Sequence, residues 1–196
     1  ELAVETEKNR RLYHDMNNHN LVMWKLAEKG EYERLHKYIG KLRPLEKDRH
    51  RQWTQNLILD MILEYKLLAM EKKKILYEIK TDMIGEIALA DKELCILLGN
   101  LLDNAIEACE KLEEKKRMVK IEVRKHHSMF MLIVENSCEA HAQVRKGIFR
   151  TTKKDDRMHG YGIHNVRKTV KNRGGQFQYG SRGENFYVKI LIPLVI

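Results

Sequence analysis

The chain has 196 residues, of which 43% are hydrophobic and 33% charged, and its formal net charge is +9 at pH 7. This length and composition allow one ordinary domain or two small ones with a real core. No run reaches the roughly 18 consecutive apolar residues of a membrane span, and no signal peptide precedes the first helix. Because the sequence begins in charged helical sequence without an initiator Met, we expect it to be part of a longer protein.

The first 51 residues predict a helical hairpin. A helix over residues 1–29 places its apolar side chains on one face, Gly30 supplies a turn, and a second helix runs through Leu42 until Pro44 ends or kinks it. A hairpin this short cannot bury its apolar stripe alone. We therefore expect two copies to pair into a four-helix bundle, which makes the protein a homodimer.

Residues 52–196 predict a second domain of the α+β class, a sandwich of one sheet with its helices on a single face. The expected elements, in chain order, are a helix from an N-cap at Thr54 to Lys74, a strand at 75–80, a helix at 93–109, strands at 119–124 and 130–135, a helix at 163–173, and strands at 177–179 and 186–193. No internal repeat or low-complexity tract interrupts them.

Most of the positive charge lies in one glycine-containing segment. Residues 145–173 contain ten Lys or Arg and two Asp, a net of +8. This clustering favours a polyphosphate ligand or an acidic partner domain, with a solvated basic loop as the alternative. No recognised nucleic-acid-binding module accompanies it, so we expect no direct contact with nucleic acid.

The three cysteines, Cys95, Cys109 and Cys138, lie in or beside apolar segments and lack metal-ligand spacing. This pattern predicts buried, reduced thiols of a cytosolic protein. We expect no disulfide.

The polar face of the first helix carries His14, Asp15 and Asn18. An exposed imidazole is a usable nucleophile near neutral pH, and the Asp15 carboxylate could hold the Nδ1 proton so that Nε2 keeps its lone pair. Asn18, one turn along, could orient a water for the reverse hydrolysis. The alternative is an ordinary surface histidine.

The helix at 93–109 is apolar on one face but is interrupted by Asn100 and Asn104. A buried amide must be satisfied, so two amides at i and i+4 call for a shared partner outside the helix. A metal ion with phosphates would satisfy both. The alternative places the two asparagines on the solvent edge of an amphipathic helix.

The sequence His159-Gly160-Tyr161-Gly162 precedes the last helix. Glycines let the backbone approach a ligand closely, and a helix N-terminus offers unpaired N–H groups to an anion. Together with the preceding Thr151-Thr152-Lys153 and the basic segment, this pattern predicts a phosphate-binding loop.

In this order and spacing, the motifs resemble those of a bacterial sensor histidine kinase, over essentially all 196 residues. HDMNNH at 14–19 resembles the phosphoacceptor box, NLLDNAIEA at 100–108 the N box of the GHKL ATPases, and HGYGIHNV at 159–166 the glycine box. The HD-x-x-N-H box, the HGYG sequence and the ending FYVKILIP are similar to the peptide-pheromone quorum-sensing kinases of Gram-positive bacteria.

The resemblance implies ATP and Mg²⁺ as cofactors. ATP would phosphorylate His14, and Asn104 with Asn100 would hold the Mg²⁺ that bridges the phosphates. Gly160 and Gly162 would form the hinge of a lid over the triphosphate. The other residues implied at the nucleotide are Asn136, Thr152, Lys153, His159 and Tyr161, with Lys153 and His159 near its charge.

The resemblance also implies the organisation of the protein. Residues 1–51 would dimerise and carry the phosphohistidine, and residues 52–196 would be a GHKL-type ATP-binding domain. The phosphoryl group would pass to an aspartate of a response-regulator receiver domain. The chain would be the cytoplasmic portion of a membrane protein whose sensor lies ahead of Glu1, and the segment at 51–54 would bend to bring ATP to His14.

Three positions depart from the common pattern. The aspartate that usually reads the adenine amino group is replaced by Asn136, whose amide oxygen can accept the same hydrogen bond with neutral strength, so we expect weaker nucleotide affinity. Glu107 stands where a basic residue is common, so phosphate neutralisation falls to Lys153, Lys154 or Arg157. Ile96 replaces a polar residue and leaves Glu93 as a poor base, so we assign the base role to Asp15.

Two other functions fit the same residues. A nucleotide-weak adaptor or phosphatase would keep the fold and remove phosphate from a receiver domain. An ATP-driven conformational clamp would leave His14 as an ordinary surface residue. The intact amide pair and glycine box favour the kinase.

Overall fold

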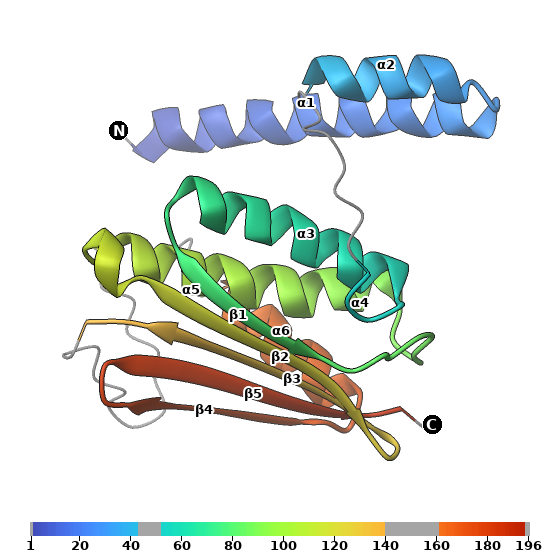
Figure 1. Ribbon diagram of the computed structural model, residues 1–196. Helices are drawn as coiled ribbons and strands as arrows, with labels where there is room; N and C mark the ends of the chain where they lie inside the picture. The colour runs from blue at the N-terminus through green and yellow to red at the C-terminus, as the bar shows by residue number, and fades with distance from the viewer. Residues whose placement is uncertain (1, 43–51, 140–160, 195–196) are drawn as a thin grey trace. The chain divides into compact units, whose positions relative to one another are not determined.

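The computed structural model describes residues 2–42, 52–139 and 161–194 (Figure 1). The chain divides into two compact units, Glu1–Arg49 and His50–Ile196. No helix in the described residues has both the length and the apolar character needed to cross a bilayer.

The first unit is the predicted helical hairpin. Helix α1 spans Leu2–Glu28 and α2 spans Tyr32–Leu42. Gly30 joins them with φ of +69°, a left-handed conformation that glycine adopts without strain. The backbone N–H of Gly30 donates to the carbonyl of Ala27, and that of Glu31 to Leu26, so the end of α1 is closed by hydrogen bonds.

The apolar stripe of the hairpin is only partly covered by the two helices. The hydroxyl of Tyr38 on α2 lies 2.8 Å from Nδ1 of His19 on α1. Nearer the N-terminus of α1, Leu12 and Met16 remain 54% and 58% exposed, and no described side chain of α2 is fully buried. The hairpin therefore leaves apolar surface that a further partner could cover.

The second unit is built on a five-stranded sheet in the order β1-β2-β3-β5-β4. The strands are β1 (Leu76–Thr81), β2 (Met118–His126), β3 (Met129–Ser137), β4 (Gln176–Arg182) and β5 (Asn185–Pro193). β1 pairs parallel with β2, and the other pairs are antiparallel. The unit is of the α+β class that the sequence predicted, and its sheet is mixed.

Alternation along the three central strands decides which face of the sheet is buried. Every second residue is buried, and the register aligns these residues across the strands: Ile121 faces Val134, and Leu132 faces Ile190. One face is thus continuously apolar, and the helices cover it. Figure 1 shows α3, α5 and α6 packed with this sheet.

The helices of this unit are α3 (Leu57–Lys72), α4 (Asp91–Leu94), α5 (Asn100–Glu110) and α6 (Tyr161–Asn172), with a short 3₁₀ turn at Glu114–Lys116. A π-helical turn, Cys95–Gly99, connects α4 to α5 without a break. The helix predicted at 93–109 is therefore present as a continuous helix over 91–110, which we call the N-box helix. The sequence did not indicate its π turn.

The sequence predicted Thr54 as the N-cap of α3, and this prediction is wrong. The cap is Asn56, whose side chain accepts from the N–H of Leu59 at 3.1 Å. Thr54 is fully buried, and its N–H and hydroxyl both donate to Oδ1 of Asp60, at 2.9 and 2.7 Å. Two hydrogen bonds thus hold Thr54 to Asp60, whereas Arg51 lies outside the described residues and the hinge at 51–54 stays a prediction.

The cysteines differ from one another, whereas the sequence predicted three buried thiols. Cys109 is buried, Cys138 is half-buried and Cys95 is exposed. Burial raises the pKa of the Cys109 thiol, which lies within 3.7 Å of the carbonyls of Met118 and Ser137. Cys95 begins the π turn, whose buried residues are Leu97 and Leu98, and this explains its exposure.

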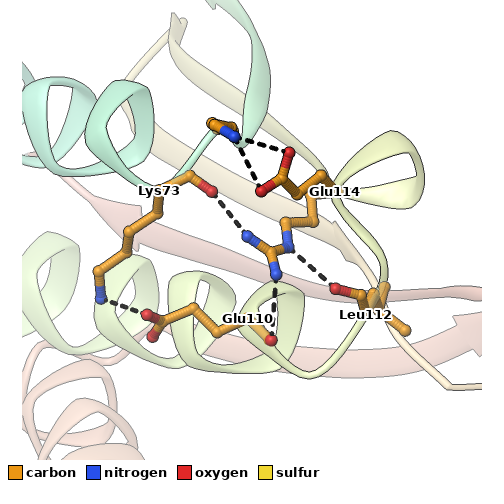
Figure 2. A network of polar contacts seen from close by, with 6 residues as sticks. Lys73, Glu110, Leu112 and Glu114 are labelled. Atoms are coloured by element: carbon orange, nitrogen blue, oxygen red, sulfur yellow. Dashed lines mark hydrogen bonds and ion pairs between the residues drawn. The ribbon is translucent and has the colours of Figure 1, made fainter.

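Arg117 joins the C-terminal ends of α3 and α5. Its guanidinium donates to the carbonyls of Lys73 at 2.8 Å, Leu112 at 3.0 Å and Glu110 at 3.4 Å. Figure 2 shows these contacts, together with the ion pair between Lys73 and Glu110 at 2.9 Å. The last carbonyls of a helix lack intrahelical donors, and a cation stabilises them.

We expect Arg117→Met to lower the free energy of unfolding by about 1.5–3 kcal/mol, because it leaves three carbonyls without their charged donor. Chemical denaturation monitored by circular dichroism measures this loss. Lys115→Met is the matched control, since Lys115 forms an exposed ion pair with Glu113 whose removal should cost about 1 kcal/mol or less. Equal losses in the two variants would contradict the role of Arg117.

Candidate functional site

Asn100 begins α5 directly after the π turn, and its side chain is oriented by the helix itself. Its Nδ2 donates to the carbonyl of Ile96 at 2.7 Å. Because a carbonyl can only accept, the nitrogen of the amide must face Ile96, and the oxygen Oδ1 points away from that bond. The half-buried Asn100 therefore presents an oxygen, the atom type that Mg²⁺ prefers, away from its own helix.

Gly162 in the first turn of α6 lies directly against this oxygen. A Cβ added at Gly162 would be 2.7 Å from Oδ1 of Asn100, closer than real Cβ contacts. Only glycine fits here without moving the amide. The structure thus brings the N box and the glycine box together, although 62 positions separate Asn100 from Gly162 in the sequence.

Asn104 lies one turn after Asn100 and is exposed. Its neighbour Asp103 forms an ion pair with Lys66 at 2.5 Å. The amide pair is therefore accessible and is not sealed inside the apolar core, as a shared external partner requires. Among the described residues, no group of three or more His, Cys, Asp or Glu could hold a metal. A Mg²⁺ at this place would depend on amide and phosphate oxygens.

Asn136 lies near the end of β3 and is only 5% exposed. It continues the buried row of Leu132 and Val134, so its side chain faces the helices. Its Nδ2 donates to the carbonyl of Ser137 at 2.9 Å, so Oδ1 points away from that carbonyl. The amide is thus oriented by a hydrogen bond from its nitrogen, and Oδ1 is the oxygen that the sequence assigned to the adenine amino group.

Glu93 makes a two-pronged ion pair that the sequence did not reveal. Nε and Nη2 of Arg173 donate to its two carboxylate oxygens at 2.8 and 2.5 Å, and the N–H of Ala90 donates to Oε2. The hydrogen bonds from Arg173 hold the pKa of Glu93 below its ordinary value. A charged carboxylate fully engaged in this way is a poor general base, which agrees with the interpretation from the sequence.

His14 and its neighbours lie on the solvent face of α1. The side chains of His14 and Asp15 are 76% and 69% exposed, and Nδ1 lies 3.8 Å from Oδ1 of Asp15. The amide of Asn18 is nearer, with Nδ2 at 3.2 Å from Nδ1. Asp15 was predicted to hold the Nδ1 proton, but in the structure Asn18 is the residue within hydrogen-bond distance.

Several predicted site residues lie outside the described residues: Thr152, Lys153, Lys154, Arg157, His159 and Gly160. Tyr161 is the first residue of α6, so this helix begins two residues earlier than the predicted 163. Gly162 therefore belongs to the first helical turn and not to the preceding loop. Of the glycine box, the structure places Gly162 at the N box.

The family profile described as the GHKL domain matches residues 89–193. No curated protein sequence matches the chain significantly. Among solved structures, the catalytic domain of histidine kinase ThkA has a TM-score of 0.57 at 20% identity, covering 71% of this chain and 91% of that chain. Acinetobacter baumannii histidine kinase AdeS has a TM-score of 0.53 at 16% identity, covering 85% and 82%.

A third structure, the histidine kinase domain of the blue-light activated histidine kinase EL346 from Erythrobacter litoralis, has a TM-score of 0.51 at 14% identity, covering 74% of this chain and 65% of that chain. At these identities the structures show a shared fold. The profile match is longer than half of the chain and includes Asn100, Asn104, Asn136 and Gly162. The chain belongs to the GHKL domain family.

Proposed function

We propose that this chain is the catalytic portion of a sensor histidine kinase, in which the GHKL domain binds Mg²⁺–ATP and the γ-phosphoryl group is transferred to His14. The observation that carries the proposal is the contact between Gly162 and the oriented Oδ1 of Asn100. The backbone of a glycine close to an oxygen that can bind Mg²⁺ suits a site where the metal and the backbone both contact a phosphate.

Asn100 and the exposed Asn104 are the proposed Mg²⁺ ligands. When bound, the metal would neutralise charge on the phosphates, which supplies much of the catalysis in phosphoryl transfer. The N–H groups in the first turn of α6 would bind phosphate oxygens. Asn136 is proposed at the adenine, with Tyr161 and the predicted residues Thr152, Lys153, His159 and Gly160 completing the nucleotide site.

At the phosphoacceptor, Nε2 of His14 would attack the γ-phosphorus, a P–N bond would form, and the bond to the bridging oxygen of ADP would break. The attack leaves the ring cationic until Nδ1 loses its proton, which Asp15 would accept. Asn18 would contribute before this step. If its side-chain amide turns by 180°, Oδ1 takes the place of Nδ2 and accepts a hydrogen bond from Nδ1–H of His14. This bond keeps the proton on Nδ1 and the lone pair on Nε2.

The wider assignment follows from the same proposal. The helical hairpin would pair with a second copy, because its apolar residues Leu12 and Met16 stay exposed. The phosphoryl group would pass from His14 to an aspartate of a response-regulator receiver domain. The chain would act as the cytoplasmic portion of a membrane-anchored receptor of the peptide-pheromone quorum-sensing type.

The test is to incubate the chain with γ-labelled ATP and Mg²⁺ and to measure protein-bound phosphate. We expect label that acid removes and base does not, the stability of a phosphohistidine, and we expect chelation of Mg²⁺ to abolish its formation. ATP binding without label would contradict the kinase and favour an ATP-driven clamp.

The second candidate is an adaptor or phosphatase acting on a receiver domain. It is favoured by Asn136, a neutral amide where a carboxylate would bind adenine more strongly, and by Asn18, which could orient a hydrolytic water beside His14. Absence of both label and ATP binding, together with accelerated loss of phosphate from a phosphorylated receiver domain, would favour this candidate over the kinase.

A further inference from the structure

The ion pair between Glu93 and Arg173 joins the start of the N-box helix to the end of α6. Both nitrogen–oxygen contacts are short, and the side chains are only 21% and 24% exposed. A two-pronged pair that is shielded from water fixes direction as well as distance, unlike the exposed ion pairs of this chain. Its geometry therefore constrains the two helices it connects.

The other end of α6 is the end that meets Asn100. Gly162 lies eleven positions before Arg173, which corresponds to about 16 Å along a helix. A rotation of α6 by 5° about its Arg173 end would move the first turn by about 1.4 Å. Displacements near 1 Å are enough to change catalytic rates by about a hundredfold.

Apolar packing holds α6 along a single stripe of side chains. Among the described side chains of α6, Val166 and Val170 are buried, and the partly buried Ile163 of the first turn packs against the same core. Such a stripe holds the helix against the core but defines its direction weakly. The ion pair adds a polar attachment at the Arg173 end of α6, beyond the last buried valine.

We infer that the Glu93–Arg173 pair is a positioning device for the nucleotide site, which sets the angle of α6 so that Gly162 stays against Asn100. The inference rests on the proposed function of that site. Neither residue is a proposed ligand of the nucleotide: Glu93 is about two helical turns before Asn100, and Arg173 follows the opposite end of α6.

The test compares Glu93→Gln and Arg173→Met with Glu110→Gln as the matched control. Glu110 forms an ion pair with Lys73 at the far end of the same helix. The measurements are the equilibrium dissociation constant for Mg²⁺–ATP, the midpoint of thermal unfolding, and hydrogen exchange of the α6 amides without nucleotide. Arg173→Met leaves the hydrogen bond from Ala90 to Glu93 intact, so it separates the pair from the helix cap.

We expect both variants at the pair to weaken Mg²⁺–ATP binding by about five- to tenfold and to speed hydrogen exchange at 165–168, the first amides of α6 with carbonyl partners inside the helix. The double variant should bind Mg²⁺–ATP as tightly as the single variants, because the two substitutions remove the same interaction. The exchanged pair Glu93→Arg with Arg173→Glu should recover part of the affinity. Glu110→Gln removes a more exposed ion pair and should leave affinity and α6 exchange unchanged.

Unchanged affinity in Glu93→Gln and Arg173→Met, or equal losses in Glu110→Gln, would overturn the inference. Failure of the proposed function is a different result, in which the unaltered chain does not bind Mg²⁺–ATP at all. Hydrogen exchange still decides the inference in that case, since faster exchange at 165–168 in Glu93→Gln than in Glu110→Gln supports the positioning of α6 and equal exchange contradicts it.

Discussion

His14→Gln is expected to remove all acid-labile phosphate from the protein. A glutamine amide has no nucleophilic lone pair at neutral pH, so the P–N bond cannot form. The side chain of His14 is 76% exposed on α1, and glutamine is a good helix former, so the hairpin should keep its fold. The measurement is label per protein after a fixed time with Mg²⁺ and γ-labelled ATP.

The matched control is His36→Gln, since His36 is also an exposed histidine of the hairpin but lies on α2. It should retain the full label. Nucleotide affinity should be unchanged in both variants, because the GHKL domain carries the nucleotide. Label that persists in His14→Gln, or that disappears in His36→Gln, would show that another residue accepts the phosphoryl group.

The elements of the fold could be predicted because their apolar spacing is local. Val119, Ile121 and Val123 alternate as a half-buried strand, and the leucines of the N-box helix recur at helical spacing. Such patterns survive in the structure because one face of each element is buried. The strand ends and the start of α6 differ from the predicted positions by a few residues, since hydrogen bonding and not apolar spacing sets those limits.

Features that depend on contacts between distant residues could not be predicted. Glu93 and Arg173 are 80 positions apart, and nothing in either local sequence indicates the other. The N-cap of α3 was predicted wrongly because threonine and asparagine are both good N-caps, so the sequence does not choose between Thr54 and Asn56. In the structure the hydroxyl of Thr54 is buried and donates to Asp60. The π turn leaves the apolar spacing almost unchanged, so it gives no sequence signal.

The candidate site was predicted in its residue types and only partly in its geometry. The sequence identified Asn100 and Gly162 by motif, and the structure adds that one lies against the other. The partner of His14 was predicted from adjacency as Asp15, whereas helical geometry brings i+4 residues together and favours Asn18. The oligomeric state and the receiver domain stay predictions.

Gly162→Ala is expected to weaken Mg²⁺–ATP binding by about 10- to 100-fold, the usual cost of disturbing a residue that orients a metal ligand. The new methyl group would lie 2.7 Å from Oδ1 of Asn100, and the amide must turn away to relieve the clash. Because the displaced atom ends a side chain, the fold should tolerate the change. Alanine also favours a helix over glycine by about 1 kcal/mol, so stability should not fall.

Gly99→Ala is the matched control, because it makes the same chemical change in a helical residue of the N-box helix where a Cβ would meet nothing within 4 Å. Titration with Mg²⁺–ATP should give unaltered affinity for Gly99→Ala and the full loss for Gly162→Ala. With Mg²⁺ removed, the two variants should bind ATP equally, since Asn100 would act on the nucleotide only through the metal. A loss in Gly162→Ala that persists in full without Mg²⁺ would show that the methyl group acts on the backbone contacts to phosphate, and it would contradict an effect through Asn100 and the metal.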